Sequence, residues 1–210
     1  MFKQLQFLAV PAVCSLFLTA SPLAAAPNES DDSVTFNMVV SAGSKTCLPK
    51  ATGTVRITPA GPVEIMDVIV QGLPPKTDFD FFVIQVPKAP FGVAWYQGDI
   101  ETDKNGRAHR QFVGRFSIET FAFAQGPAPA PVVFDGPFPD ASLNPSFNPI
   151  QMYHLGLWFG SPQAAQAAGC PATETAFNGE HNAGLQVLNT SNFADDHGPL
   201  RDVNPSAPKP

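Results

Sequence analysis

The chain has 210 residues, with 12 basic and 18 acidic side chains and a net charge of −6. An acidic chain without a cluster of Lys and Arg is poorly suited to nucleic acid or to an anionic membrane surface, so we expect neither as a partner. The length after the N-terminal segment suits one large domain.

Residues 1–26 have the pattern of a secretory signal peptide, with Lys3 at a positive start, an apolar run from Phe7 to Leu18, and small residues over 21–26. The run is short and is broken by Pro11, and no later segment has the roughly 20 apolar residues that a membrane helix needs. The sequence therefore predicts a secreted, periplasmic or cell-surface protein without a membrane span.

Removal of the leader takes Cys14 away and leaves Cys47 and Cys170 in an oxidising compartment. We expect one disulfide between them; two free thiols or metal ligands are the alternative. On the chain-entropy model, a loop of this length stabilises the fold by roughly 4 to 5 kcal/mol.

Strand signals recur along most of the remaining chain, as runs rich in β-branched and aromatic residues between Gly, Pro, Asn or Asp. The runs are Val34–Val40, Gly53–Thr58, Val63–Val70, Phe79–Val86, Val93–Ile100, Ala108–Phe123, Gln151–Phe159 and Gly184–Asn189. Within the seventh run, apolar Tyr153, Leu155, Leu157 and Phe159 alternate with other residues, which is the period of a strand. The pattern predicts an all-β fold over residues 27–194, an antiparallel β-sandwich of Ig-like or Greek-key type with about eight or nine strands.

Three further segments interrupt or follow these strands. Residues 125–149 contain seven prolines and predict a long loop that is either a binding surface or a mobile flap. One short helix is predicted after Ser161, an N-cap residue followed by a proline, and before Gly169, which suits a helix C-terminus. Residues 195–210 are rich in proline and predict a loosely ordered tail.

The alternating oxygen ligands of Asp99-x-Glu101-x-Asp103-x-Asn105-Gly106 resemble part of a calcium-binding loop. An EF-hand that begins at Glu101 has Phe112 at position twelve, where a bidentate Glu is needed. We favour a β-hairpin turn in which Gly106 adopts a positive φ, with the calcium site as the alternative.

The candidate ligand-binding residues are two tryptophans, two histidines and a glutamate. They are Trp95, His154, Trp158, Glu180 and His181. The two tryptophans, together with Tyr96, suit stacking on a sugar ring if they are exposed, although aromatic residues in strands more often belong to the core. Glu180 and His181 belong to a polar, glycine-containing segment ahead of the last strand. No histidine pair has a metal-binding spacing and no nucleophile motif is present, so we predict no catalytic residue, no metal ligand and no cofactor.

The segments Ala51–Ile57, Val68–Pro75 and Thr102–Ala108 resemble the strand pattern of chordin-type (CHRD) domains and copper–zinc superoxide dismutases. The resemblance covers about a third of the chain and implies a secreted β-sandwich. Dismutases carry a His-x-His pair after the Gly-Leu turn, whereas this chain has Phe79-Asp80-Phe81-Phe82, so no metal residue is carried over.

Two functions follow as expectations. The first is an exported, non-catalytic binding or structural module whose partner is an extracellular ligand or protein of unknown identity. The alternative is a metal-dependent or hydrolytic secreted enzyme with its site near His154 and His181.

Overall fold

A computed structural model describes residues 32–124, 148–176 and 181–205 of the protein. The predicted signal peptide at 1–26 and residues 125–147 of the Pro-rich segment lie outside the described residues. The elements are β1 (Val34–Val40), η1 (Ala42–Ser44), β2 (Thr52–Ala60), β3 (Val63–Gln71), β4 (Asp78–Ile84), β5 (Ala94–Glu101), β6 (Ala108–Gly114), β7 (Phe121–Ala124), β8 (Asn148–Gln151), β9 (His154–Phe159), α1 (Pro162–Ala167), β10 (Gln186–Asn189) and η3 (Pro199–Asp202). Of the helices in these ranges, none has the length and apolar character needed to cross a membrane.

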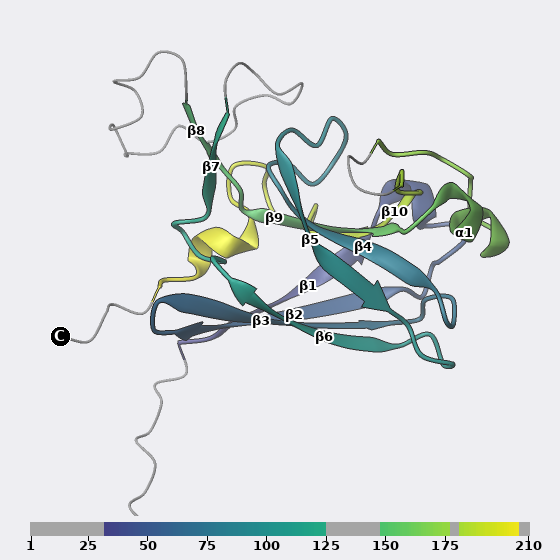
Figure 1. The fold of residues 1–210 in the computed structure, drawn as a ribbon, viewed down its shortest axis with the longest axis horizontal. Helices are drawn as coiled ribbons and strands as arrows, with labels where there is room; N and C mark the ends of the chain where they lie inside the picture. Colours follow the sequence, from purple (N-terminus) through teal and green to yellow (C-terminus); the bar gives the residue numbers. More distant parts are fainter. Residues whose placement is uncertain (1–31, 125–147, 177–180, 206–210) are drawn as a thin grey trace, which may run out of the picture. The chain divides into compact units, whose positions relative to one another are not determined.

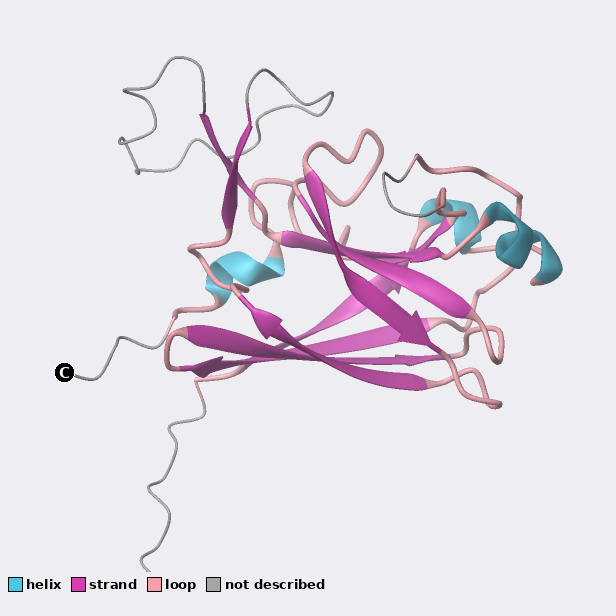
Figure 2. Ribbon diagram, in the orientation of Figure 1, coloured by secondary structure: helices cyan, strands magenta, loops and turns pink. Residues whose placement is uncertain are grey.

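Eight strands form one antiparallel sheet in the order β5-β4-β9-β10-β1-β2-β3-β6, and β7 pairs with β8 in a separate ribbon. Figure 1 shows the eight strands folded into two layers, with β5, β4, β9 and β10 in one and β2, β3 and β6 in the other. Strand β1 belongs to both, because residues 34–38 pair with β2 and Val39 and Val40 pair with β10. Strands dominate the described residues in Figure 2, and the predicted all-β antiparallel fold is confirmed.

The core between the layers is built on phenylalanine. Phe79, Phe81, Phe116 and Phe159 are all fully buried. Phe79 and Phe159 meet within one layer with ring centroids 5.1 Å apart, and Phe81 of β4 stacks on Phe112 of β6 in the opposite layer at 5.5 Å. Large buried aromatic side chains contribute much of the burial energy of a core, and this pair joins the two layers directly.

The short helix begins and ends where the sequence predicts. The Ser161 hydroxyl accepts a hydrogen bond from the Ala164 N–H at 3.1 Å, and Gly169 has a φ of +77°, which a glycine adopts without steric cost. Cys170 follows and forms the predicted disulfide with Cys47, with a sulfur–sulfur distance of 2.00 Å and Cα atoms 5.3 Å apart. The disulfide fixes the end of α1 to the connection between β1 and β2.

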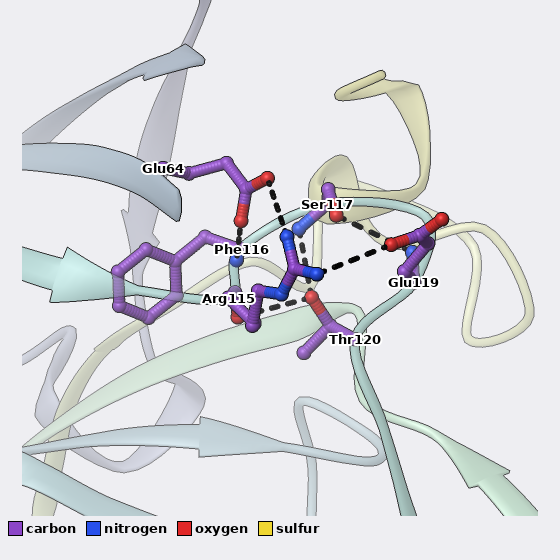
Figure 3. Close-up of polar contacts among 6 residues, drawn as sticks. All are labelled: Glu64, Arg115, Phe116, Ser117, Glu119 and Thr120. Atoms are coloured by element: carbon purple, nitrogen blue, oxygen red, sulfur yellow. Dashed lines mark hydrogen bonds and ion pairs between the residues drawn. The ribbon is translucent and has the colours of Figure 1, made fainter. Parts of the chain in front are cut away.

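The predicted strand Ala108–Phe123 is divided in the structure, because β6 ends at Gly114 and β7 begins at Phe121. Buried Glu64 of β3 accepts a hydrogen bond from the Phe116 N–H at 2.7 Å, while Arg115 lies 3.8 Å from the same carboxylate (Figure 3). The Thr120 hydroxyl closes the bend, since it accepts from the Ser117 N–H and donates to the Arg115 carbonyl. The strand pairing therefore ends at Gly114, and side-chain hydrogen bonds stabilise the bend that follows.

The segment from Asp103 to Arg107 forms a turn, but not a hairpin. Asp103 accepts hydrogen bonds from the backbone N–H groups of Asn105 and Arg107, and Gly106 has a φ of +69° as expected. The flanking strands pair with different partners, β5 with β4 and β6 with β3. The turn therefore passes the chain from one layer to the other.

The C-terminal segment differs from the predicted loose tail over residues 195–205. Leu200 and Val203 are fully buried in the core, and the Ile118 N–H donates to the Val203 carbonyl at 2.9 Å. Burial of these two apolar side chains orders the segment despite the prolines around them. Residues 206–210 lie outside the described residues.

The disulfide yields a first prediction. Replacement of both Cys47 and Cys170 by Ala should lower the free energy of unfolding by up to about 4 to 5 kcal/mol, because the 123-residue separation gives the unfolded chain much more freedom. Urea unfolding of the oxidised protein, the double variant and the reduced wild type measures the loss. Equal midpoints for the three would contradict it.

The bend in Figure 3 yields a second prediction. Glu64→Gln should destabilise the protein by about 2 kcal/mol, because the Phe116 N–H loses a charged acceptor in a fully buried position. Glu119→Gln is the matched control, since it removes the exposed partner of Arg115 and should cost less than about 1 kcal/mol. Equal unfolding midpoints for the two variants would show that the buried hydrogen bond of Glu64 adds no measurable stability.

Candidate functional site

A cluster of three carboxylates lies on the outer face of the β4–β5 pair. Phe79 and Phe81 face the core, so the alternation of a strand directs Asp78 and Asp80 to the opposite face. The register of the two strands places Asp99 directly opposite Asp80. One carboxylate oxygen from each aspartate lies within 4.8 Å of the other two, and the described ranges contain no other such group of three potential metal ligands.

Asp80 is the unusual member because its side chain is fully buried and, within the described part of the chain, neither oxygen has a hydrogen-bond partner. The Nε2 atom of His181 lies 3.5 Å from Oδ1, which is an ion-pair distance and too long for a good hydrogen bond. Burial raises the pKa of Asp80 to about 6, and the charges of Asp78 and Asp99 add to this effect while His181 opposes it. The pKa of Asp78 is also raised, by burial and by Asp99 and Glu101.

Tyr96 lies beside this cluster on β5. Its hydroxyl donates a hydrogen bond to Oδ1 of Asp99, and its side chain is 42% exposed. Burial of the hydroxyl raises the pKa of Tyr96, and the hydrogen bond and charge of Asp99 raise it further. Tyr96 therefore remains a neutral hydrogen-bond donor across the physiological pH range.

An aromatic cluster continues across the same face to β9. The Trp158 ring packs edge-on against Phe82 and Phe91, with ring centroids 5.2 and 5.0 Å away, and Phe82 also contacts Tyr96 at 5.7 Å. A Cβ at Gly156 would lie 2.3 Å from a ring carbon of Trp158, so this glycine makes room for the indole. Only 3% of Trp158 is exposed.

A cavity of about 520 Å³ lies beside the indole of Trp158. Phe91 and Leu185 give it an apolar wall, and Gln186 and Asn189 add polar groups. The Nε1–H of Trp158 is buried and has no acceptor among the described residues. A buried donor is almost always satisfied in native proteins, so this N–H calls for an acceptor that the described residues do not supply.

His154 occupies a structural position. Its two ring nitrogens lie 2.8 Å from the Thr190 hydroxyl and 3.1 Å from the Asp195 carbonyl, and its side chain is fully buried. Burial lowers the pKa of His154, which favours the neutral ring. The residue opposite His154 on β4 is Ile84, which lies four residues and about 13 Å along the strand from Asp80. Because His181 lies at Asp80, the structure does not bring His154 and His181 together.

The other predicted binding residues fall into three groups. Trp158 and His181 both lie next to Asp80, since Trp158 is its neighbour on β9 and His181 is its ion-pair partner. Trp95 packs against the core on the opposite face of the sheet, and its N–H donates to the Gln97 side chain at 3.1 Å. Glu180 lies outside the described residues.

Sequence reasoning did not select Asp78 or Asp80, and it considered Asp99 only in the alternative calcium loop and Tyr96 only as a ring for sugar stacking. The available signal was the alternation of Asp78 and Asp80 with Phe79 in a predicted strand, which places two carboxylates on one face. The pairing of β4 with β5 was not available, because no short hairpin signal joins them.

No protein-family model matches this chain, and no curated protein matches it. The resemblance to chordin-type domains and copper–zinc superoxide dismutases therefore stays a prediction, and the site is interpreted from its own geometry.

The raised pKa of Asp80 yields a third prediction, for protein kept in a chelator. Folding raises this pKa from 3.8 to about 6, so the wild type should lose stability as the pH rises from about 4 to about 6, relative to Asp80→Asn. The difference should reach at most about 3 kcal/mol above pH 6, with burial of the carboxyl as its main cause.

Urea unfolding between pH 4 and pH 8 measures this difference. Asp67→Asn is the control with the opposite sign, because the hydrogen bond from His109 lowers the pKa of Asp67 and this substitution should destabilise at neutral pH. Parallel pH profiles for wild type and Asp80→Asn would contradict the prediction.

Proposed function

We propose that this protein is an exported β-sandwich module that binds an extracellular ligand in the cavity beside Trp158 and performs no chemistry of its own. The leader pattern of residues 1–26 and the Cys47–Cys170 disulfide support an oxidising, extracytoplasmic location.

The proposal is carried by Trp158, which lines the cavity and whose buried N–H has no partner among the described residues. Binding sites for small molecules are concave and mostly apolar, with a few polar groups that orient the ligand. The cavity beside Trp158 has this composition. An oxygen acceptor on the ligand would satisfy the indole N–H, while Phe91 and Leu185 would cover an apolar part of the ligand.

The polar side chains of this region support a non-catalytic role. The Ser41 and Ser44 hydroxyls both donate to the Gln186 carbonyl, and Cys47 and Cys170 are joined. Both ring nitrogens of His154 have partners. A nucleophile with an adjacent base is the pattern expected of a hydrolase, and these residues do not form one.

The secreted enzyme is retained as a second candidate because of Asp80 and His181. A buried carboxyl with a pKa of about 6 beside an exposed imidazole is a combination that general acid–base catalysis can use. It differs from the binding module in one observable respect, the chemical fate of the ligand.

Native mass spectrometry of the purified protein, incubated with an extract of the producing cell's envelope and medium, tests the proposal. Wild type should retain a small molecule of defined mass and release it chemically unchanged. Trp158→Phe should reduce occupancy at least about tenfold because it removes the N–H and keeps most of the ring. Trp95→Phe is the matched control, since this indole faces the core and donates to Gln97.

Three outcomes would overturn the proposal. These are no adduct on the wild type, equal occupancy in Trp158→Phe and Trp95→Phe, or a ligand released with altered mass. The last of these would favour the hydrolytic enzyme.

A further inference from the structure

The three-aspartate cluster has the composition and spacing of a site for a hard divalent cation. Asp78 and Asp80 come from one strand and Asp99 from its neighbour, so the sheet itself sets the spacing of the carboxylates. Three like charges within 4.8 Å repel one another, and each offers oxygen ligands. Oxygen-rich sites favour Ca²⁺ or Mg²⁺ over softer metals.

Proximity of acidic residues does not by itself indicate a ligand, since exposed carboxylates often share a surface without one. Asp80 adds an independent observation, because its carboxylate is fully buried and neither oxygen accepts a hydrogen bond from any described residue. A buried ionised group without hydrogen bonds is costly, and native proteins pair such groups or use them to coordinate metals. His181 faces Asp80 at 3.5 Å but does not satisfy either oxygen.

The placement of the carboxylates on two paired strands favours Ca²⁺ over Mg²⁺. Ca²⁺ binds about six to eight oxygen ligands at about 2.3 to 2.6 Å in a flexible geometry, so it tolerates carboxylates whose spacing is set by a sheet. Mg²⁺ demands near-ideal octahedral geometry at about 2.0 to 2.1 Å and gives up its waters reluctantly, so it is less tolerant of carboxylates held by two strands. The exposed Asp78 and Asp99 leave room for water on the solvent side.

We infer that Asp78, Asp80 and Asp99 form a Ca²⁺ site on the β4–β5 pair. This site is distinct from the loop suggested by the motif that starts at Asp99. Asp103 of that motif already accepts two backbone hydrogen bonds in its turn, whereas Asp99 contributes to the cluster from within β5.

Isothermal titration calorimetry of the chelator-stripped, disulfide-intact protein with Ca²⁺, Mg²⁺ and Zn²⁺ tests the inference. One Ca²⁺ should bind with a Kd of about 10⁻⁴ to 10⁻³ M, the range of extracellular modules, and more tightly than Mg²⁺. Asp80→Asn and Asp99→Asn should each weaken binding at least about tenfold, because each removes a charged ligand. Asp67→Asn on β3 is the matched control and should bind as wild type does.

Circular dichroism melting in chelator separates ligand loss from misfolding. Asp80→Asn should remain folded there, because it removes a buried charge without a hydrogen-bond partner, and Ca²⁺ should raise the Tm of wild type but not of this variant.

The inference is overturned by absent Ca²⁺ binding in folded wild type, by unchanged affinity in Asp80→Asn, or by a preference for Zn²⁺ that His181→Ala abolishes. None of these results depends on the cavity beside Trp158, so this inference and the proposed function fail separately.

Discussion

The two layers depend on β1, which forms backbone hydrogen bonds on both of its edges. Its first five residues pair with β2 and its last two with β10, so a single strand passes from one layer into the other. A sheet that continues through a shared strand fixes the distance and angle between its layers, and the phenylalanine core fills the space that results. The contact of Phe81 with Phe112 across the layers depends on this constraint.

The position of the candidate site follows from the same two-layer arrangement of strands. Strand β4 must direct Phe79 and Phe81 inward to complete the core, and its period of two then places Asp78 and Asp80 together on the other face. Neighbouring strands complete the surroundings of Asp80, with Asp99 from β5 and Trp158 from β9. A substitution that shifted the register of β4 by one residue would move the aspartates into the core and the phenylalanines to the surface.

The parts of the fold that depend on local signals could be predicted from the sequence. Ser161 and Gly169 bound the helix in the structure as their types suggest, and the two cysteines of the described chain are joined. The division of the run 108–123 could not be predicted, because Glu64, about 50 residues earlier, captures the N–H of Phe116. The carboxylate cluster was missed for the same reason, since strand pairing is a long-range property. His154 illustrates the converse, because a residue type suited to catalysis serves here to bind the Thr190 hydroxyl.

The disulfide has a consequence for maturation. If the predicted leader is cleaved and takes Cys14 with it, Cys47 and Cys170 allow one intramolecular pairing and no mispaired isomer. A chain that retained Cys14 would have three possible pairings, two of them non-native. Cleavage of the predicted leader before oxidation would therefore remove any need for disulfide shuffling, and the remaining error in disulfide formation would be a cross-link between two copies.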